Sequence, residues 1–401
     1  MSPKKILLGV SGGIAAYKAV DFMRALQKAG HDVTVMMTKN ATKFINPLTF
    51  QALSGHPVGI DLFDGTFSHI DLARSCDAIV IAPATANIIA KIALGIADDL
   101  LSTTIMARAW TVPLIIAPAM NSEMWQSKPV IENTQTLHRR HVTIVPPASG
   151  TLACGEIGYG RLAHLENILH AVYEQLTHQD LTHFRLVVTA GPTRERIDPV
   201  RYITNDSSGK MGYALATQAA LRGAQVTLIS GHTNLPNPPG VKTIRVESAH
   251  DMKCVTSGKS KQADALIMAA AVADFRPTNQ ANQKLHKGEL GDEPKILLTK
   301  NTDILAEMGK RNIPALRVGF AAETGEETKG LLSATAKLKA KNCHLLVYNR
   351  VDKEGQGFGS NQNAVTIIDR KGESEKISLD DKTVIANRIL DRLAGLYQES
   401  N

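Results

Sequence analysis

The sequence predicts two α/β domains, each a doubly wound parallel sheet covered by helices. A strand–glycine–helix–glycine–strand pattern occurs twice, about 180 residues apart, and KAGHDVTVMMT in the first copy corresponds to LRGAQVTLISG in the second. The chain of 401 residues is also long enough for two domains of ~150–200 residues each. A spacing this long is not that of a solenoid repeat.

The first pattern begins with an apolar strand at residues 5–10 and a tight turn, Ser11-Gly12-Gly13. Helical spacing of apolar residues then predicts a helix over 14–29, which Gly30 ends before a second strand at 32–37.

The remaining elements follow from continuous apolar runs and from helical spacing. In the first half they are strands at 77–82 and 112–117 and helices at 85–94, 98–108 and 162–177. In the second half they are strands at 186–190, 225–230, 264–269, 316–321 and 344–348, and helices from 210, at 328–342 and at 381–397. The polar segment THQDLTH predicts a linker, so we expect domains over 1–180 and 181–401, with the boundary near Asp180. Residues 278–292 show no period and predict a surface loop that could act as a lid.

The segment Asn205-Asp206-Ser207-Ser208-Gly209-Lys210 precedes a helix. A helix start presents unpaired N–H groups and the positive end of a dipole, which suits a phosphate. An ordinary Ser/Asp helix cap explains the same residues equally well, so the segment alone leaves both interpretations open.

Composition narrows the class of protein. The net charge of +7 suits anionic ligands, but aromatic residues make up only 4%, too few for a nucleic-acid stacking surface. No apolar run reaches the ~18 residues of a membrane span, and Ser11-Gly12-Gly13 interrupts the only signal-like run. The cysteines Cys76, Cys154, Cys254 and Cys343 form no CxxC pair, which disfavours zinc and disulfides and indicates a cytoplasmic setting.

Ligands of open α/β sheets bind beyond the carboxyl ends of the strands. The loops to consider are therefore SGG at 11–13, APATAN at 82–87 and PAMNSEMW at 118–125. The glycines at 155, 158 and 160 in ACGEIGYGRL predict a mobile flap.

Three candidate catalytic residues lie in or near these loops: His69, Asn121 and Cys154. A lone histidine or cysteine is more often structural than catalytic. Their loop settings favour function, since the Asn121 amide could bind a carboxylate and the Cys154 thiol could deliver a proton.

Ordered motifs along nearly the whole chain carry a resemblance to a known family. SGGIAAYKA, SHIDLAR, APATANIIAKIALGIADDLLSTT, PAMNSEMW and ACGEIGYGRL are followed by GPTRERIDPVRYITNDSSGKMG, AAAVADFRP, GFAAET and GFGSNQNAVTIID. This series resembles the bacterial bifunctional phosphopantothenoylcysteine decarboxylase/phosphopantothenate–cysteine ligase of coenzyme A biosynthesis.

For the first half, the resemblance implies a flavodoxin-like or Rossmann-like domain that binds FMN. Flavin oxidation of the substrate thiol to a thioaldehyde supplies the electron sink that decarboxylation of a cysteine needs. His69 would act as the base-side residue, Asn121 would hold the substrate carboxylate, and Cys154 would be the final acid. The flavin contacts implied are Ser11, Thr38, Asn87 and Ser102.

For the second half, the resemblance implies a Rossmann-like ligase that activates 4′-phosphopantothenate with CTP and joins the acyl-cytidylate to L-cysteine. Asn205 would hold this intermediate, and Lys284 would close over the triphosphate. The implied CTP contacts are Asp274, Lys284, Thr302, Asp303, Ile304, Leu305, Phe320, Lys337 and Lys341. Spacing alone would place Lys337 and Lys341 as an i,i+4 pair on a solvated helix face. The triphosphate implies Mg2+, although the sequence shows no ligand set for this ion. The resemblance also implies a homo-oligomer, a dodecamer in which flavin domains form trimers and ligase domains form pairs.

Two other classes of protein remain as alternatives. A nicotinamide-dependent reductase would also use two Rossmann-like units, but GVSGGIA and AGPTRE do not give GxGxxG. A non-catalytic nucleotide-binding protein would bind these ligands without turning them over.

Overall fold

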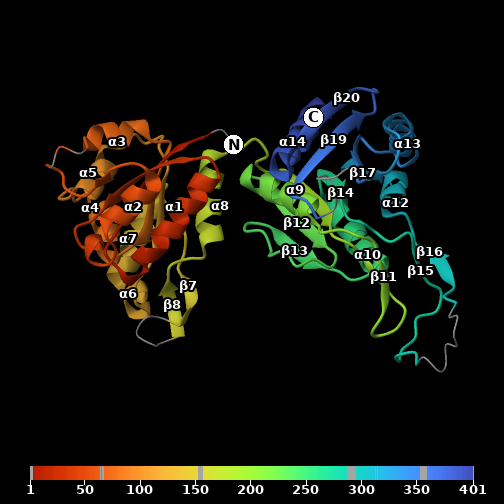
Figure 1. The fold of residues 1–401 in the computed structure, drawn as a ribbon, viewed down its shortest axis with the longest axis horizontal. Helices are drawn as coiled ribbons and strands as arrows, with labels where there is room; N and C mark the ends of the chain where they lie inside the picture. Colours follow the sequence, from red (N-terminus) through yellow and green to blue (C-terminus); the bar gives the residue numbers. More distant parts are fainter. Residues whose placement is uncertain are drawn as a thin grey trace. The chain divides into compact units, whose positions relative to one another are not determined.

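The computed structural model describes residues 3–63, 65, 67–151, 157–286, 295–311, 313, 315–352 and 359–400. The chain forms two compact units, Met1–His178 and Gln179–Asn401 (Figure 1). Among the described residues, no helix combines the length and the apolar character needed to cross a membrane.

The first unit contains a six-stranded parallel sheet. Its strands, in spatial order, are β3 (Val58–Gly59), β2 (Asp32–Met37), β1 (Lys5–Val10), β4 (Ala78–Ala84), β5 (Leu114–Pro118) and β6 (Thr143–Ile144). This is the order 3-2-1-4-5-6 of a doubly wound fold, in which the direction of winding reverses between β1 and β4.

Helices cover both faces of this sheet. They are α1 (Lys18–Lys28), α2 (Pro47–Ser54), α3 (His69–Ser75), α4 (Ala86–Leu94), α5 (Leu100–Ala107), α6 (Ser122–Gln126), α7 (Lys128–Arg139) and α8 (Leu165–Leu176). Successive residues of β1 enter different cores: Ile6 and Leu8 pack with α1, α2 and α8, whereas Leu7 packs with α3, α4, α5 and α7. Burial on both faces explains why the strand is a continuous apolar run rather than an alternating one.

The second unit contains an eight-stranded mixed sheet. In spatial order its strands are β13 (Lys242–Arg245), β12 (Gln225–Ser230), β9 (Arg185–Ala190), β14 (Ala265–Met268), β17 (Leu316–Glu323), β18 (Leu345–Arg350), β19 (Gln362–Asp369) and β20 (Ser374–Asp381). The winding reverses between β9 and β14. One face carries α9 (Lys210–Leu221) and α14 (Lys382–Ser400), and the other carries α10 (Ala249–Lys259), α12 (Ile304–Lys310) and α13 (Glu327–Ala340).

Two antiparallel ribbons stand apart from this sheet, β10 (Arg194–Arg196) with β11 (Tyr202–Thr204) and β15 (Phe275–Pro277) with β16 (Leu298–Lys300). In Figure 1 they lie at the end of the second unit remote from α14.

The predicted doubly wound α/β fold is confirmed, and strands 5–10, 32–37 and 225–230 have the predicted bounds. The helix predicted over 14–29 instead begins with a 3-10 turn, η1 (Ile14–Tyr17), as helix starts often do. The second sheet differs from the parallel prediction in β19 and β20, which pair antiparallel. A short turn suffices to join such strands, so they carry no intervening helix to mark them in the sequence.

Candidate functional sites

The first candidate site is a cavity of about 570 Å3 beyond the carboxyl ends of β1, β4 and β5. The segment between β1 and α1, the start of α4 and the β5–α6 loop line it. The hairpin of β7 (Ala148–Thr151) and β8 (Ile157–Arg161) lines it as well. Lys18 and Arg161 supply positive charge, and Ile14, Met120 and Leu162 supply apolar surface. The position is the switch point at which doubly wound sheets bind ligands.

Ser11 connects the two central strands behind this cavity. Its hydroxyl, in a side chain that is only 1% exposed, donates to the Pro83 carbonyl at 2.8 Å and accepts from the Thr85 N–H at 2.9 Å. Ser11 therefore fixes the loop that begins α4, in addition to any contact with a ligand.

The start of α4 faces the cavity through Thr85 and Ala86. The Thr85 hydroxyl caps the helix by accepting from the Ile88 N–H, while Asn87 is exposed on the first turn. The first backbone N–H groups of a helix have no intrahelical partner, so this end can bind an anionic group.

Asn121 also lines the cavity, at the start of α6, where its side-chain oxygen accepts from the Glu123 N–H at 2.7 Å. Next to it, the Met120 N–H donates to the Gly160 carbonyl at 2.9 Å. A Cβ at Gly160 would lie 2.1 Å from the Met120 carbonyl oxygen, so only glycine allows β8 to approach this loop. Close packing therefore explains the glycine at position 160 without the predicted mobility of the flap.

Asn121 alone of the described site residues predicted in the first half lines this cavity, and Ser11, Thr38, His69, Asn87 and Ser102 do not. Thr38 follows β2 and its hydroxyl accepts from the Ala41 N–H, while His69 is the first residue of α3. Ser102 is buried in a capping box with Asp99 and lines a different cavity with Lys91 and Arg140. Cys154 lies outside the described residues.

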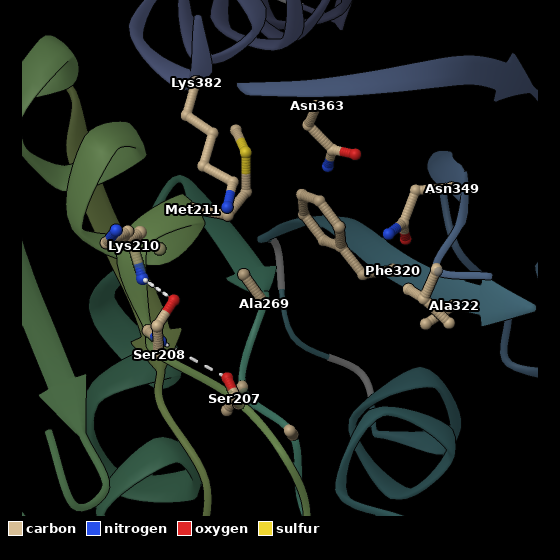
Figure 2. A pocket seen from close by; sticks show the side chains of 15 residues that line it. Ser207, Ser208, Lys210, Met211, Ala269, Phe320, Ala322, Asn349, Asn363 and Lys382 are labelled. Atoms are coloured by element: carbon tan, nitrogen blue, oxygen red, sulfur yellow. Dashed lines mark hydrogen bonds between the residues drawn. The ribbon is translucent and has the colours of Figure 1, made fainter. Parts of the chain in front are cut away.

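The second candidate site lies at the corresponding switch point of the second unit, where α9 begins. A cavity of about 140 Å3 is lined there by residues 207–212, 269–271, Phe320, Ala322, Asn349, Val351, Asn363 and Lys382 (Figure 2). Gly209 caps α9 with φ of +77°, a conformation that favours glycine, and no side chain caps the helix there. The volume suits phosphate groups rather than a whole nucleotide.

Two lysines flank this cavity. The Lys210 ammonium donates to the Gly359 carbonyl at 2.7 Å and to the Asn361 side-chain oxygen at 2.8 Å, and Lys382 donates to the Ser360 carbonyl. Burial, and then the charge of Lys210, lower the pKa of Lys382 to about 8. The sequence analysis did not single out Lys382, Asn349 or Asn363 as site residues, although Asn363 lies in the motif GFGSNQNAVTIID.

Several predicted nucleotide contacts form ion pairs between neighbouring elements. Asp303 caps α12 by accepting from the Ala306 N–H at 3.0 Å, and it binds the Lys341 ammonium at 3.0 Å. Burial raises the pKa of Asp303, but the cap bond and Lys341 outweigh it, so the pKa lies below its usual value. Lys337 binds Glu323 at 2.5 Å at the end of β17. Lys337 in α13 and Lys341, which caps its C-terminus, therefore each bind a carboxylate of another segment instead of lying on a solvated helix face.

The other predicted CTP contacts lie in loops, in strand β17 and at the start of helix α12. Thr302 is exposed before α12, while Ile304 and Leu305 are buried in its first turn. Asp274 is exposed before β15. Phe320 alone of the predicted nucleotide contacts lines the cavity at α9.

Asn205 and Lys284 are both exposed. The Asn205 amide donates to the Val272 carbonyl at 3.1 Å, which ties the loop before α9 to the loop after β14. Lys284 precedes Leu285, whose N–H donates to Asp198 at 3.2 Å. Of the segment predicted as a lid, residues 278–286 are irregular and residues 287–292 lie outside the described residues.

Comparisons with known proteins match both halves. Residues 1–177 match the family model described as "Flavoprotein", and residues 181–396 match that described as "DNA/pantothenate metabolism flavoprotein C-terminal domain". The coenzyme A biosynthesis bifunctional protein CoaBC of Vibrio vulnificus (strain CMCP6) is 44% identical over 402 residues, covering 99% of this chain and 98% of its own. The protein of the same name from Bacillus subtilis (strain 168) is 43% identical over 408 residues, covering 100% and 99%. A solved structure described as "The FMN binding protein AtHal3" is 32% identical with a TM-score of 0.38, covering 42% of this chain and 94% of that one.

Proposed function

This chain belongs to the family of coenzyme A biosynthesis bifunctional proteins, and from that membership we propose that its two units catalyse consecutive reactions. The family combines a flavoprotein decarboxylase unit with a ligase unit. In the proposal, residues 181–401 join 4′-phosphopantothenate to L-cysteine at the expense of CTP, and residues 1–180 decarboxylate the product to 4′-phosphopantetheine with FMN.

The observation that carries the proposal is the pair of cavities at the two switch points. Each lies in the half that its family model matches, at the strand ends where such sheets bind ligands. The alternative reductase predicts two dinucleotide loops, and the full-length similarity to CoaBC proteins argues against it.

The residues of the first cavity fit FMN. Its volume lies in the usual range of ~300–1,000 Å3 for a cofactor site. The start of α4 with Lys18 or Arg161 would hold the phosphate, and the apolar side chains of Ile14 and Met120 would face the ring system. When bound, the flavin supplies the two-electron chemistry that makes loss of CO2 from the substrate possible.

The protein's own residues orient the substrate in the decarboxylation. The Asn121 side chain lines the cavity and would hold the substrate carboxylate through its amide, which can donate without adding charge. Cys154 would deliver the final proton, and His69 would act on the base side. Ser11 and Asn87 would support the flavin from the strand and helix ends, with Thr38 and Ser102 as further contacts.

Assembly into a homo-oligomer, a dodecamer, is part of the proposal. Large apolar side chains on the first unit are strongly exposed, among them Phe63 at 89% and Trp110 at 79%, and burial between copies would cover them. Because His69 does not line the cavity of its own chain, a role at the substrate fits a site that a neighbouring copy completes.

In the proposed ligase reaction, a carboxylate oxygen of 4′-phosphopantothenate attacks the α-phosphorus of CTP, and pyrophosphate leaves with the electrons of the broken P–O bond. The cysteine amine then displaces CMP from the acyl-cytidylate. Asn205 would hold that intermediate, while Lys284, Asp274, Phe320, Lys337, Lys341 and the 302–305 segment would bind the nucleotide. Lysines suit this step because negative charge develops on the leaving pyrophosphate. The triphosphate would bring Mg2+ with it.

Two measurements on one preparation of the full chain test the proposal. The purified protein should be yellow, with FMN released on denaturation, and it should form CO2 from 4′-phosphopantothenoylcysteine. With 4′-phosphopantothenate and L-cysteine it should convert CTP to CMP and pyrophosphate. A colourless protein that turns over neither substrate would overturn the assignment, and reduction of a nicotinamide cofactor would favour the alternative.

A further inference from the structure

Lys382 is a buried cation with no carboxylate partner among the described residues. It is the first residue of α14 and is only 7% exposed. Its ammonium donates to the Ser360 carbonyl, and within the described ranges it forms no ion pair. A buried lysine is normally paired with an opposite charge. No described carboxylate therefore offsets the charge of Lys382.

The charges around Lys382 further disfavour its protonated, charged form. The positive charge of Lys210 lowers the pKa of Lys382. The Lys210 ammonium binds Gly359 and Asn361, the two neighbours of the residue that Lys382 binds, Ser360. The neighbouring carboxylates Asp380 and Asp381 are exposed and form no ion pair with it in the described part of the chain. Two ammonium groups thus converge on one small cavity, which is the arrangement expected around a multiply charged anion.

Asn363 gives an independent indication that something binds in this cavity. Its side chain is 5% exposed, and its oxygen accepts from the Ala364 N–H at 3.0 Å. Its amide nitrogen has no hydrogen-bond partner among the described residues, and Figure 2 shows it directed toward Phe320 across the cavity. An amide N–H that lines a cavity without a protein acceptor is able to donate to a ligand bound there.

The start of α9 completes the set of donors. Lys382 points from α14 toward Met211 and Lys210 at this helix start (Figure 2). The first N–H groups of α9 have no intrahelical partners. The Lys210 N–H donates to the Ser208 hydroxyl at 3.5 Å, and the next two residues, Met211 and Gly212, also line the cavity. Backbone donors, an amide and two cations thus line the same space.

We infer that Lys382, together with Lys210 and Asn363, binds phosphate groups of a substrate of the ligase, and that Lys382 takes up a proton when they bind. The inference rests on the proposed ligase function. The phosphates could be those of CTP, and so of the leaving pyrophosphate, or the 4′-phosphate of phosphopantothenate. In either case Lys382 is a binding residue, and the bound anion offsets the charge that burial and Lys210 disfavour.

The proton uptake follows from the pKa of about 8 in the free protein. At pH 8, about half of the molecules carry a neutral Lys382. A bound phosphate favours the charged form and raises the pKa, so up to about half a proton is taken up per site. At pH 6.5 the lysine is already charged and uptake through it disappears.

Isothermal titration calorimetry of the full chain tests the inference. Mg·CTP, Mg·pyrophosphate and 4′-phosphopantothenate are titrated separately at pH 8, each in two buffers with different ionisation enthalpies. The ligand whose binding takes up a proton in the wild type identifies the phosphate source. Lys382→Met should weaken that ligand about 10- to 100-fold and abolish the uptake. Lys382→Arg should bind within a few-fold of wild type but without uptake, because arginine stays charged.

Lys371→Met is the matched control, since Lys371 is exposed in the turn before β20 and pairs with Glu399. It should leave affinity and uptake unchanged. Wild-type affinity and uptake in Lys382→Met would overturn the inference while ligation by the wild type would still support the proposed function. If the wild type neither binds these ligands nor ligates, the proposed function fails instead. Should Lys382→Met not fold, persistence of proton uptake in Lys382→Arg would refute the inference and its loss would support it.

Discussion

Asp180 and Arg222 form an ion pair between an exposed carboxylate and a buried guanidinium at the beginning of the second unit. The Arg222 guanidinium, in a side chain 6% exposed, donates to both carboxylate oxygens of Asp180, one of them at 2.9 Å, and also binds Asp391 at 2.8 Å. Gln179 joins this contact by donating to the Leu221 carbonyl at 2.7 Å. The segment expected to be a linker is thus attached to the end of α9.

This contact predicts where the chain can be divided. A fragment that begins at Gln179 should be more stable than one that begins at Leu181 by about 1–3 kcal/mol, because the shorter one leaves Arg222 with one fewer carboxylate. Urea unfolding followed by circular dichroism measures the difference. Both fragments should retain CTP-dependent ligation. Equal unfolding midpoints would show that Asp180 adds nothing to the stability of this unit.

Replacement of Ser11 should affect both stability and flavin binding. Ser11→Ala leaves the buried Pro83 carbonyl and Thr85 N–H without their partner, at a cost of about 1–3 kcal/mol, and loosens the start of α4. Loss of flavin absorbance on heating and a flavin titration of the apoprotein report the two effects. Thr42→Ala, which removes an exposed hydroxyl bound to the Lys39 carbonyl, is the control. Wild-type values for Ser11→Ala would contradict the bridging role.

Replacement of Lys337 or Lys341, which form ion pairs with Glu323 and Asp303, should affect CTP binding more than replacement of Lys339. Lys337→Gln and Lys341→Gln should each raise the KM for CTP about 10-fold, the effect of losing one charge-assisted hydrogen bond. Lys339 lies on the same helix but is exposed, and Lys339→Gln should have no effect. Initial rates of pyrophosphate release, with CO2 release as an internal control, make the comparison. Equal KM values for all three variants would remove α13 from the nucleotide site.

Cys154→Ser should stop the decarboxylation cycle at its last step. A serine hydroxyl is a much weaker acid than a thiol, so CO2 should still be released while the final saturated product fails to form. Product analysis after a single turnover distinguishes these steps. Cys76→Ser is a suitable control, because burial raises the pKa of the Cys76 thiol to about 11. Formation of 4′-phosphopantetheine at the wild-type rate by Cys154→Ser would exclude the proton-donor role.

His344 should make the second unit less stable in mild acid. Burial, and then Arg370 and Arg317, lower its pKa to about 4, and its Nδ1 accepts from the Arg317 N–H at 2.9 Å. The unfolded chain therefore binds a proton first, so the stabilisation is present above pH 6.5 and is lost as the pH falls toward 4. For a partly exposed ring, the loss between pH 7.5 and 5 should be about 1 kcal/mol.

Urea unfolding of the fragment from Gln179 at these two pH values measures this loss. In His344→Gln the pH dependence should shrink by that amount, whereas His250→Gln, at an exposed position on α10, should leave it unchanged. An undiminished pH dependence in His344→Gln would assign the effect to other groups.

The sequence by itself determined the fold class and predicted a site in each half of the chain. Buried strands such as β1 and β12 are continuous apolar runs, and the small residues before Lys210 mark a helix start, so consecutive residues contain this information. The order of the motifs also determined the family, because this order can be seen in the sequence without any interatomic distance.

Only the tertiary structure decided which side chains meet. Sheet order brings the start of α14 beside the start of α9, so Lys382 and Lys210 share a cavity although no local pattern connects them. Tertiary packing also places the Ser11 hydroxyl where it donates to the Pro83 carbonyl. The Ser102 side chain takes part in a capping box with Asp99. Periodicity reflects contacts between neighbours along the chain, whereas these contacts depend on how separate elements pack, and that packing is decided by the burial of whole faces.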